Sequence, residues 1–307
     1  MRRRFLGNPV FDYTRYMTIE SLEDGLFIQV PSHVEYTIDG TWKRLGINDS
    51  IEVNKGQLIS FKKTNVIGIF GTFIINGRCN LRGNCMSMVF GDSGYKNNDL
   101  SELYAPFSNM FKDCTGIVSV EPTFLPATTL VDNCYEHMFE GCTSLVTAPE
   151  LPATTLANNC YNSMFYGCSN LNYIKMLATD ISAIGCFDFW VIDVASTGTF
   201  VKNAAMTSLP AGSSGIPEGW TVVNDGVNLI TFYIADSINI HPNFVEYTAE
   251  EGMTWGEWID SDYNTSDLYI GEYSSVLTPD GFGINDNTGG MIRSSDIIIN
   301  GYEYTKG

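Results

Sequence analysis

Cysteine is the residue type in this 307-residue chain with the most distinctive chemistry, and all eight cysteines fall between residues 79 and 186. Cys134, Cys160 and Cys186 follow one another at intervals of 26 residues. Metal-binding thiolates usually come in short pairs such as Cys-x2-Cys, which the chain lacks. Equal spacing favours buried thiols that stack as small apolar side chains, with disulfides or a metal site as less favoured alternatives. A similar series consists of Cys114, Cys142 and Cys168, and Cys79 and Cys85 stand near its start.

Other reactive residue types give no recognisable constellation. The histidines, His33, His137 and His241, are far apart in the sequence, and no spacing predicts a nucleophile, a base and an acid in contact. Residues 260–267 begin like a calcium loop, but the sixth position is Thr265 where that loop needs glycine. We therefore expect turns in the acidic segments, no metal, no cofactor and no enzymatic activity.

Four of the cysteines lie in a sequence that occurs twice, LPATTLVDNCYEHMFEGCTSL at 125–145 and LPATTLANNCYNSMFYGCSNL at 151–171. Self-similarity at a period of about 20 to 50 residues is typical of stacked repeats. Weaker echoes lie at 84–90, 109–117 and 181–191, which predicts four to five repeats with degenerate ends. Within each copy we expect a short helix capped by Asp132-Asn133 or Asn158-Asn159 and ended by Gly141 or Gly167, followed by a strand.

The pattern LPATTLxxNCYxxMFxGCTSL resembles the BspA-type leucine-rich repeats, most specifically over residues 105–175. Such repeats occur in surface proteins of gut bacteria and in their phages. The resemblance implies a short leucine-rich-repeat solenoid that serves as a binding scaffold on an outer surface.

The flanking regions predict two further β-rich parts. Residues 17–77 contain strand-like runs separated by Asp24-Gly25, Asp39-Gly40 and Gly56, which predicts a sandwich-like domain of about six strands joined by hairpins. A run at 66–75 predicts a strand buried on both faces. Residues 224–307 predict two strands, a short helix starting at Thr254 and a strand pair at 296–305, in a small α+β module of β-grasp type. The whole chain is therefore expected to be multidomain and β-rich: a basic arm at 1–16, the sandwich-like domain at 17–77, repeats with caps at 78–223 and the α+β module at 224–307.

The first residues are basic, although the chain carries a formal net charge of −18. A charge of this sign argues against a nucleic-acid partner, because phosphates are bound by clustered lysine and arginine. The start lacks the apolar core of a secretion signal, and no run approaches about 18 apolar residues, so we expect neither secretion nor a membrane span. Such an arm could order on docking into an acidic groove of a larger assembly, with a disordered tail as the alternative. The expected anchoring residues are Arg2, Arg3, Arg4 and Phe5.

Together these features favour a non-enzymatic structural protein of a phage virion, such as a head fibre, capsid decoration or tail appendage. It would be synthesised in the host cytoplasm, join other virion proteins through its arm, and bind a host cell-surface protein or glycan as a dimer or trimer. The alternatives are a bacterial cell-surface adhesin with the same repeats, and an enzyme hidden in the acidic C-terminal module. Contact residues are expected on the strand side and where the repeat copies differ: Val118, Ser119, His137, Glu140, Val146, Thr147, Ser163, Tyr166, Asn172 and Tyr173.

Overall fold

The computed structural model describes residues 11–64, 71–206, 209–226, 229–235, 244–250, 284–285 and 291–292. The chain forms two compact units, Met1–Asp225 and Gly226–Gly307. Regular structure in the described residues is mostly β-strand, which confirms the expected β-rich class. Their helical elements are short: α1 (Ser87–Phe90) and the 3-10 helices η1 (Tyr13–Arg15), η2 (Gly91–Lys96) and η3 (Pro122–Phe124).

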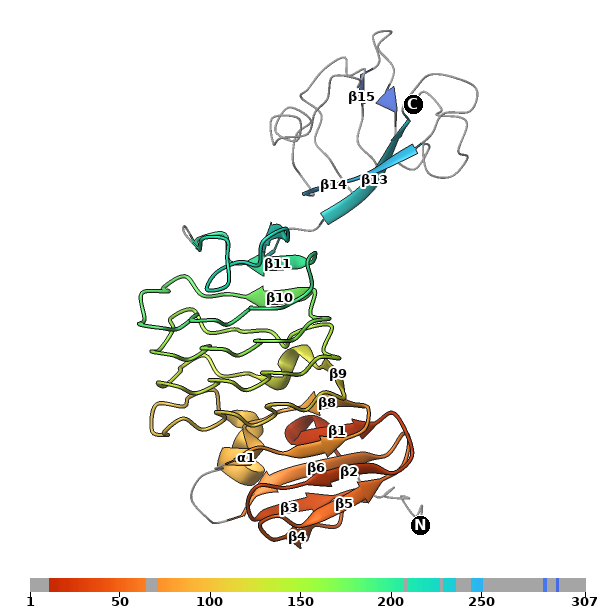
Figure 1. Cartoon of the computed structure of the whole chain (residues 1–307), viewed down its shortest axis with the longest axis vertical. Coiled ribbons are helices and arrows are strands. Elements are labelled where there is room, and N and C mark those ends of the chain that lie inside the picture. The colour runs from red at the N-terminus through yellow and green to blue at the C-terminus, as the bar shows by residue number, and fades with distance from the viewer. Residues whose placement is uncertain are drawn as a thin grey trace, which may run out of the picture. The chain divides into compact units, whose positions relative to one another are not determined.

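Two sheets make up the N-terminal part of the first unit (Figure 1). Inward side chains of both sheets, among them Ile19, Ile28 and Phe61, are fully buried in one hydrophobic cluster. The larger sheet has the order β4-β3-β6-β1-β8-β9 and consists of β1 (Met17–Ser21), β3 (Val34–Thr37), β4 (Lys43–Leu45), β6 (Leu58–Lys63), β8 (Cys79–Gly83) and β9 (Ile117–Val120). The smaller has the order β5-β2-β7 and consists of β2 (Leu26–Gln29), β5 (Ser50–Val53) and β7 (Ile74–Asn76).

Only one of the three expected hairpins in this region is correct. The Asp39-Gly40 turn joins β3 to β4, which pair antiparallel. The turns at Asp24-Gly25 and Gly56 instead carry the chain from one sheet to the other, since β1 pairs with β6 and β8, whereas β2 pairs with β5 and β7. The apolar residues before and after these turns face the shared core from opposite sides, so the chain has to change sheets.

The expected strand at 66–75 is described only from residue 71. There β7 alternates, with Ile75 buried between two exposed neighbours, so this part is not buried on both faces. Residues 66–70 of the expected strand lie outside the described residues.

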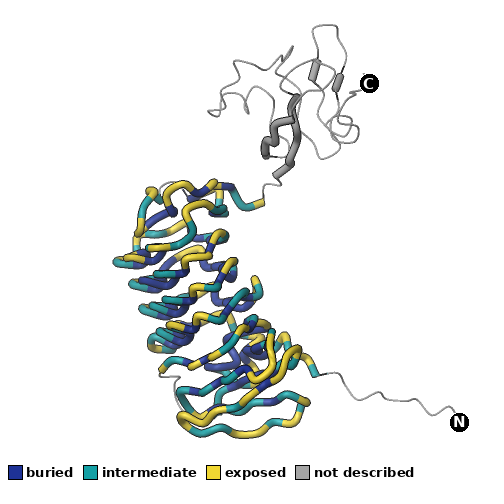
Figure 2. Tube along the Cα trace, turned by 45° about the vertical axis from the view of Figure 1, so that its right-hand side comes forward, coloured by how far each residue is buried: buried dark blue, intermediate teal, exposed yellow. Residues whose placement is uncertain are grey.

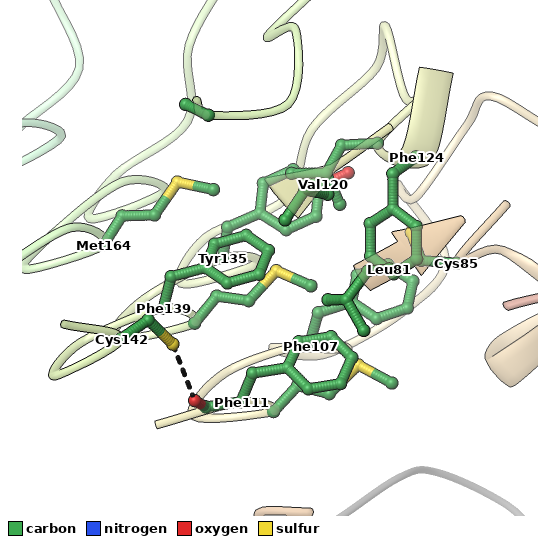
Figure 3. Packing of buried hydrophobic residues seen from close by; sticks show 14 of the residues in the cluster. Leu81, Cys85, Phe107, Phe111, Val120, Phe124, Tyr135, Phe139, Cys142 and Met164 are labelled. Atoms are coloured by element: carbon green, nitrogen blue, oxygen red, sulfur yellow. Dashed lines mark hydrogen bonds between the residues drawn. The ribbon is translucent and has the colours of Figure 1, made fainter. Parts of the chain in front are cut away.

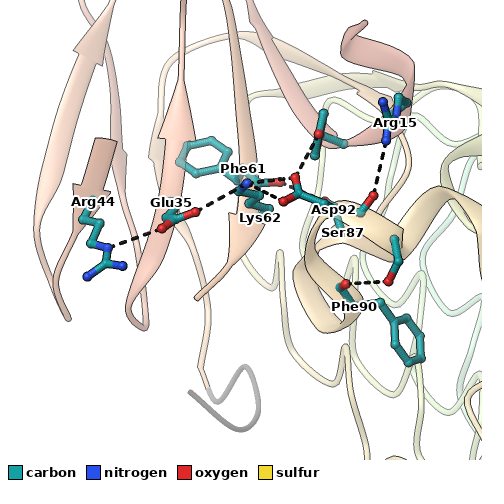
Figure 4. A network of polar contacts seen from close by, with 10 residues as sticks. Arg15, Glu35, Arg44, Phe61, Lys62, Ser87, Phe90 and Asp92 are labelled. Carbon is teal, nitrogen blue, oxygen red and sulfur yellow. Dashed lines mark hydrogen bonds and ion pairs between the residues drawn. The ribbon is translucent and has the colours of Figure 1, made fainter. Parts of the chain in front are cut away.

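Polar contacts fasten α1 and η2 to the larger sheet (Figure 4). The ammonium group of Lys62 lies 2.8 Å from the Asp92 carboxylate and 3.5 Å from that of Glu35, and 4.2 Å from the ring centre of Trp42. The hydrogen bond from Lys62 holds the pKa of Asp92 below its ordinary value. Ser87 accepts a bond from the Met17 amide and donates to a carbonyl of β6. Such a largely buried lysine has to be paired in this way, because an unpaired buried charge is costly.

The larger sheet continues into the repeat region without a break. β8 pairs antiparallel with β1 and parallel with β9. Parallel bridges then join Ser119 to Thr147 and Thr147 to Tyr173, the first residue of β10 (Tyr173–Met176). β10, β11 (Thr199–Lys202) and β12 (Thr221–Asn224) follow in parallel register. The repeats are therefore stacked in parallel on the edge of the N-terminal sheet.

The expected helices of the repeats are wrong. The aligned segments are chains of tight turns in which the first, fifth and ninth residues all have φ between 41° and 74°. Successive N–H groups alternate between a partner in the next repeat and a partner in their own repeat. The N–H of Tyr135 donates to the Cys160 carbonyl of the next repeat, and the N–H of Met138 donates to the Tyr135 carbonyl of its own repeat. An α-helix contains no left-handed residues, and its N–H groups bond carbonyls of the same helix. Here the left-handed residues turn the chain so that alternate N–H groups reach carbonyls of the next repeat, and these groups are still hydrogen-bonded. We call these the turn segments: residues 105–114, 133–142, 159–168 and 185–194.

The expected helix caps have a different role. Asp132 accepts a hydrogen bond from the amide of Asn158, and Asn158 accepts one from the amide of Ile184. The side chain of each residue thus accepts a hydrogen bond from the amide at the corresponding position of the next repeat. This series of hydrogen bonds ends at Ile184, which is exposed and has an apolar side chain.

Aromatic side chains form columns through the interior of the stack (Figure 3). Phe111 and Phe139 lie 5.7 Å apart between ring centres, and Phe139 and Phe165 lie 5.9 Å apart, nearly parallel in both pairs. A second column contains Phe107, Tyr135 and Tyr161. The tube view shows buried residues on the inside of the coils and exposed residues around the outside (Figure 2).

In the second unit, β13 (Leu229–Ala235) and β14 (Phe244–Glu250) pair antiparallel, which confirms the first two strands expected there. β15 (Ile284–Asn285) and β16 (Met291–Ile292) form a second, short antiparallel pair. The expected helix at Thr254 and the strand pair at 296–305 lie outside the described residues.

Candidate interaction surface

Three consecutive repeats bring the expected strand-side contact residues into one ladder. The amide of Val146 donates to the Val118 carbonyl at 3.2 Å, and the amide of Asn172 donates to the Val146 carbonyl at 2.9 Å. Val146 and Asn172 are exposed, and the others are partly exposed. We call this set the strand group: Val118, Ser119, Val146, Thr147, Asn172 and Tyr173.

The remaining expected contact residues lie in the turn segments and form the turn group: His137, Glu140, Ser163 and Tyr166. Glu140 hydrogen-bonds the imidazole of His137 and lies 3.0 Å from the Lys112 ammonium of the preceding repeat. Tyr166 is exposed, but Ser163 is only 6% exposed and offers a partner little surface. Within the described part of the chain, no hydrogen bond or ion pair joins the turn group to the strand group. The two groups are therefore two separate candidate contact regions.

The expected anchoring residues Arg2, Arg3, Arg4 and Phe5 lie outside the described residues.

The expectation of buried thiols is confirmed, since all eight cysteines are buried and unpaired. Burial raises the pKa of the Cys134 and Cys168 thiols to about 12, so both are protonated at neutral pH. A protonated thiol can donate, and the thiols of Cys142 and Cys168 lie 3.2 Å and 3.1 Å from the carbonyls of Phe111 and Phe139. These cysteines connect neighbouring repeats as well as filling space.

This burial predicts that the folded protein resists thiol reagents. Ellman's reagent is a disulfide that reacts with exposed thiolates. In guanidinium the unfolded chain should react at all eight cysteines, and over the same time no thiol of the folded protein should react in native buffer. Absorbance of the released thiolate measures both reactions. Rapid reaction of even one native thiol would contradict the burial of that cysteine.

Comparison with protein-family models, curated proteins and solved structures found no match for this chain. Among the described residues, none of the helices is both long and apolar enough to cross a membrane. No group of three His, Cys, Asp or Glu side chains in that part of the chain is placed to hold a metal ion.

Several exposed large hydrophobic side chains are not among the residues expected from the sequence, and two of them, Phe189 and Tyr104, occupy aligned positions of the repeats. Phe189 is 55% exposed and has φ of +56°, a conformation that bulky residues rarely adopt. It occupies the position of His137 and Ser163 in the fourth turn segment, so extending the 26-residue alignment by one repeat would have identified it. Tyr104, 79% exposed, occupies the position of Asp132 and Asn158 before the first turn segment.

Proposed function

We propose that this chain is a non-enzymatic structural and binding protein of a phage virion, such as a head fibre, capsid decoration or tail appendage. Its repeats would be a BspA-type leucine-rich-repeat solenoid placed between a sandwich-like N-terminal domain and a β-grasp-like C-terminal module. The motif resemblance over residues 105–175 supports this proposal.

One structural observation carries the binding role, namely the uninterrupted ladder from β8 through β9, Thr147 and β10. Each repeat is hydrogen-bonded to the next along both the strands and the turn segments, so the outer residues keep a fixed spacing. A rigid surface loses little conformational entropy on binding, which suits a scaffold that presents side chains to a partner. The repeat core is filled by apolar side chains and protonated thiols, which leaves the variable outer positions to determine the partner.

Attachment would use the N-terminal arm. Arg2, Arg3 and Arg4 are basic in a chain whose net charge is −18, so an acidic groove on another virion protein is the complementary site. The mature protein would act at the virion surface as a dimer or trimer after synthesis in the host cytoplasm. Its strand group would then contact a protein or glycan of the host cell.

Deletion of residues 1–6 tests the attachment. The shortened chain should fold normally yet be lost from purified particles, as measured by mass spectrometry of those particles. A matched control that replaces all three arginines by lysine keeps the charge and should retain most incorporation. Unchanged incorporation of the deletion variant would contradict the anchor, and detection of the protein on bacterial cells instead of particles would favour the adhesin.

The strand group is tested by the double substitution Val146→Ser with Tyr173→Ala. Central exposed residues of an interface account for most of its binding energy, so attachment to host cells should fall at least roughly tenfold. Tyr95→Ala, a change at an exposed tyrosine of η2 outside the strand group, is the control. Flow cytometry of fluorescent protein on host cells measures both variants, and equal binding would exclude the strand group as the contact face.

A further inference from the structure

An open cavity of about 580 Å³ lies beside the first two turn segments, and no residue of the strand group or the turn group lines it. It borders the turn group at Glu136, whose carboxylate lies 3.8 Å from the His137 imidazole. Binding sites for small molecules usually measure about 300–1,000 Å³, so this cavity has a suitable size. Its polar and aromatic lining comes from three stretches of chain and includes Thr72, Tyr104, Ser108, Asn109, Asn133 and Glu136.

The backbone of the cavity walls is fixed by hydrogen bonds. The amide of Asn109 donates to the Glu136 carbonyl at 2.9 Å, which joins the first turn segment to the second. The amide of Phe73, next to Thr72, donates to the Met110 carbonyl at 2.9 Å, and the thiol of Cys114 lies 3.1 Å from the Phe73 carbonyl. The backbone beside Thr72 and at Asn109 is therefore held in place before any ligand arrives.

Tyr104 has no evident structural role at its position. In the next two repeats the corresponding residues, Asp132 and Asn158, accept hydrogen bonds from the following repeat through their side-chain oxygens. A tyrosine places its hydroxyl far from the backbone, and Tyr104 leaves 79% of its surface exposed. An aromatic ring held at the edge of a polar cavity offers a flat apolar face to a ligand.

The other lining groups combine acceptors and donors. Asn109 donates from its side-chain nitrogen to the Ser108 hydroxyl at 2.8 Å, which orients both groups. The amide of Asn133 and the carboxylate of Glu136 add further polar atoms to the same wall. Hydroxyls, amides and one carboxylate can each bond the vicinal hydroxyls of a sugar, whose C–H face stacks on an aromatic ring.

We propose that this cavity binds a neutral saccharide, with Tyr104 as the stacking platform and Asn109, Asn133 and Glu136 as hydrogen-bonding groups. Among the residues that the structure describes, Glu136 is the only charged one that lines the cavity, so an anionic sugar is disfavoured by repulsion. This site goes beyond the function proposed above, because it shares no residue with the strand group or the turn group. It also does not require attachment to a virion.

The test uses the purified full-length chain and four neutral trisaccharides: maltotriose, cellotriose, chitotriose and mannotriose. Saturation-transfer NMR should detect binding of at least one of them. Tyr104→Ala should weaken that binding at least roughly tenfold, since aromatic anchors dominate such contacts, and Tyr104→Trp should retain it. Glu136→Gln should weaken it less, because the amide keeps one acceptor.

Tyr95→Ala is the matched control, since Tyr95 is an exposed tyrosine of η2 that lies outside the cavity, the strand group and the turn group. It should leave saccharide binding unchanged. The proposal is overturned if none of the four sugars binds, if Tyr104→Ala binds as well as the parent, or if sialyllactose binds more tightly than every neutral sugar. Because purified protein and free sugars are used, this result is independent of particle incorporation and of attachment to host cells.

Discussion

Phe139→Ala is expected to lower the free energy of unfolding by about 3–5 kcal/mol, the range for phenylalanine truncations in a packed core. Phe139 is fully buried and stacks against Phe111 on one side and Phe165 on the other. Truncation would open a cavity in the middle of the column, and the hydrogen bonds between repeats prevent the backbone from closing it. In a stack of repeats each copy depends on its neighbours, so the loss affects the interfaces on both sides. Guanidinium denaturation followed by far-UV circular dichroism measures the change.

Phe189→Asn provides a matched control, for which the expected change in the free energy of unfolding is small and of opposite sign. Phe189 lies in the fourth turn segment, is 55% exposed and has φ of +56°. Asparagine tolerates the left-handed region better than phenylalanine, so this variant should stay within about 1 kcal/mol of the parent and tend toward higher stability. Similar losses for both variants would show that the repeat interior is not packed in columns.

Gly83→Ala is the second substitution with a large expected effect, a loss of about 3 kcal/mol or more. Gly83 ends β8 with φ of +74°, and an added Cβ would lie 2.7 Å from the Tyr13 carbonyl oxygen and closer still to that of Tyr16. Both neighbours are backbone atoms and cannot rotate away. The Gly83 amide also donates to the Glu121 carboxylate at 2.5 Å, so displacement of the strand would break a contact between β8 and the first repeat.

Gly56→Ala separates the steric clash from the backbone conformation. Gly56 has φ of +78°, but nothing lies within 4 Å of an added Cβ. Only the left-handed conformation is then penalised, at about 1–2 kcal/mol. The unfolding temperature should therefore fall clearly more for Gly83→Ala than for Gly56→Ala. Equal decreases in unfolding temperature would mean that the end of β8 can move to accommodate the extra methyl group.

Sequence periodicity determined the interior of the repeats. Because Cys134, Cys160 and Cys186 recur every 26 residues, and one coil of the stack takes about 26 residues, distance along the chain translates directly into position in space. The same regularity placed Ser119, Thr147 and Tyr173 along one ladder. Local turn chemistry was sufficient for the β3–β4 hairpin, and the strand-like runs after residue 224 were sufficient to predict two strands where β13 and β14 lie.

Tertiary contacts decided what local patterns could not. The segment NCYEHMFEGC has helical spacing of its apolar residues, yet every second amide bonds the next repeat, and a helix would leave the neighbouring repeat unpaired. The Asp24-Gly25 turn looks like a hairpin turn, yet burial of Ile19 and Ile28 from opposite sides of one core sends the chain to the other sheet. The cavity at Tyr104 likewise needs three stretches of chain that no spacing connects. Within the repeats, sequence alone specified the buried Cys, Met and Phe positions that recur at the same period. It did not specify that Ser163 is buried and Phe189 exposed. The hydrogen-bond partners of the backbone were fixed only when distant segments met.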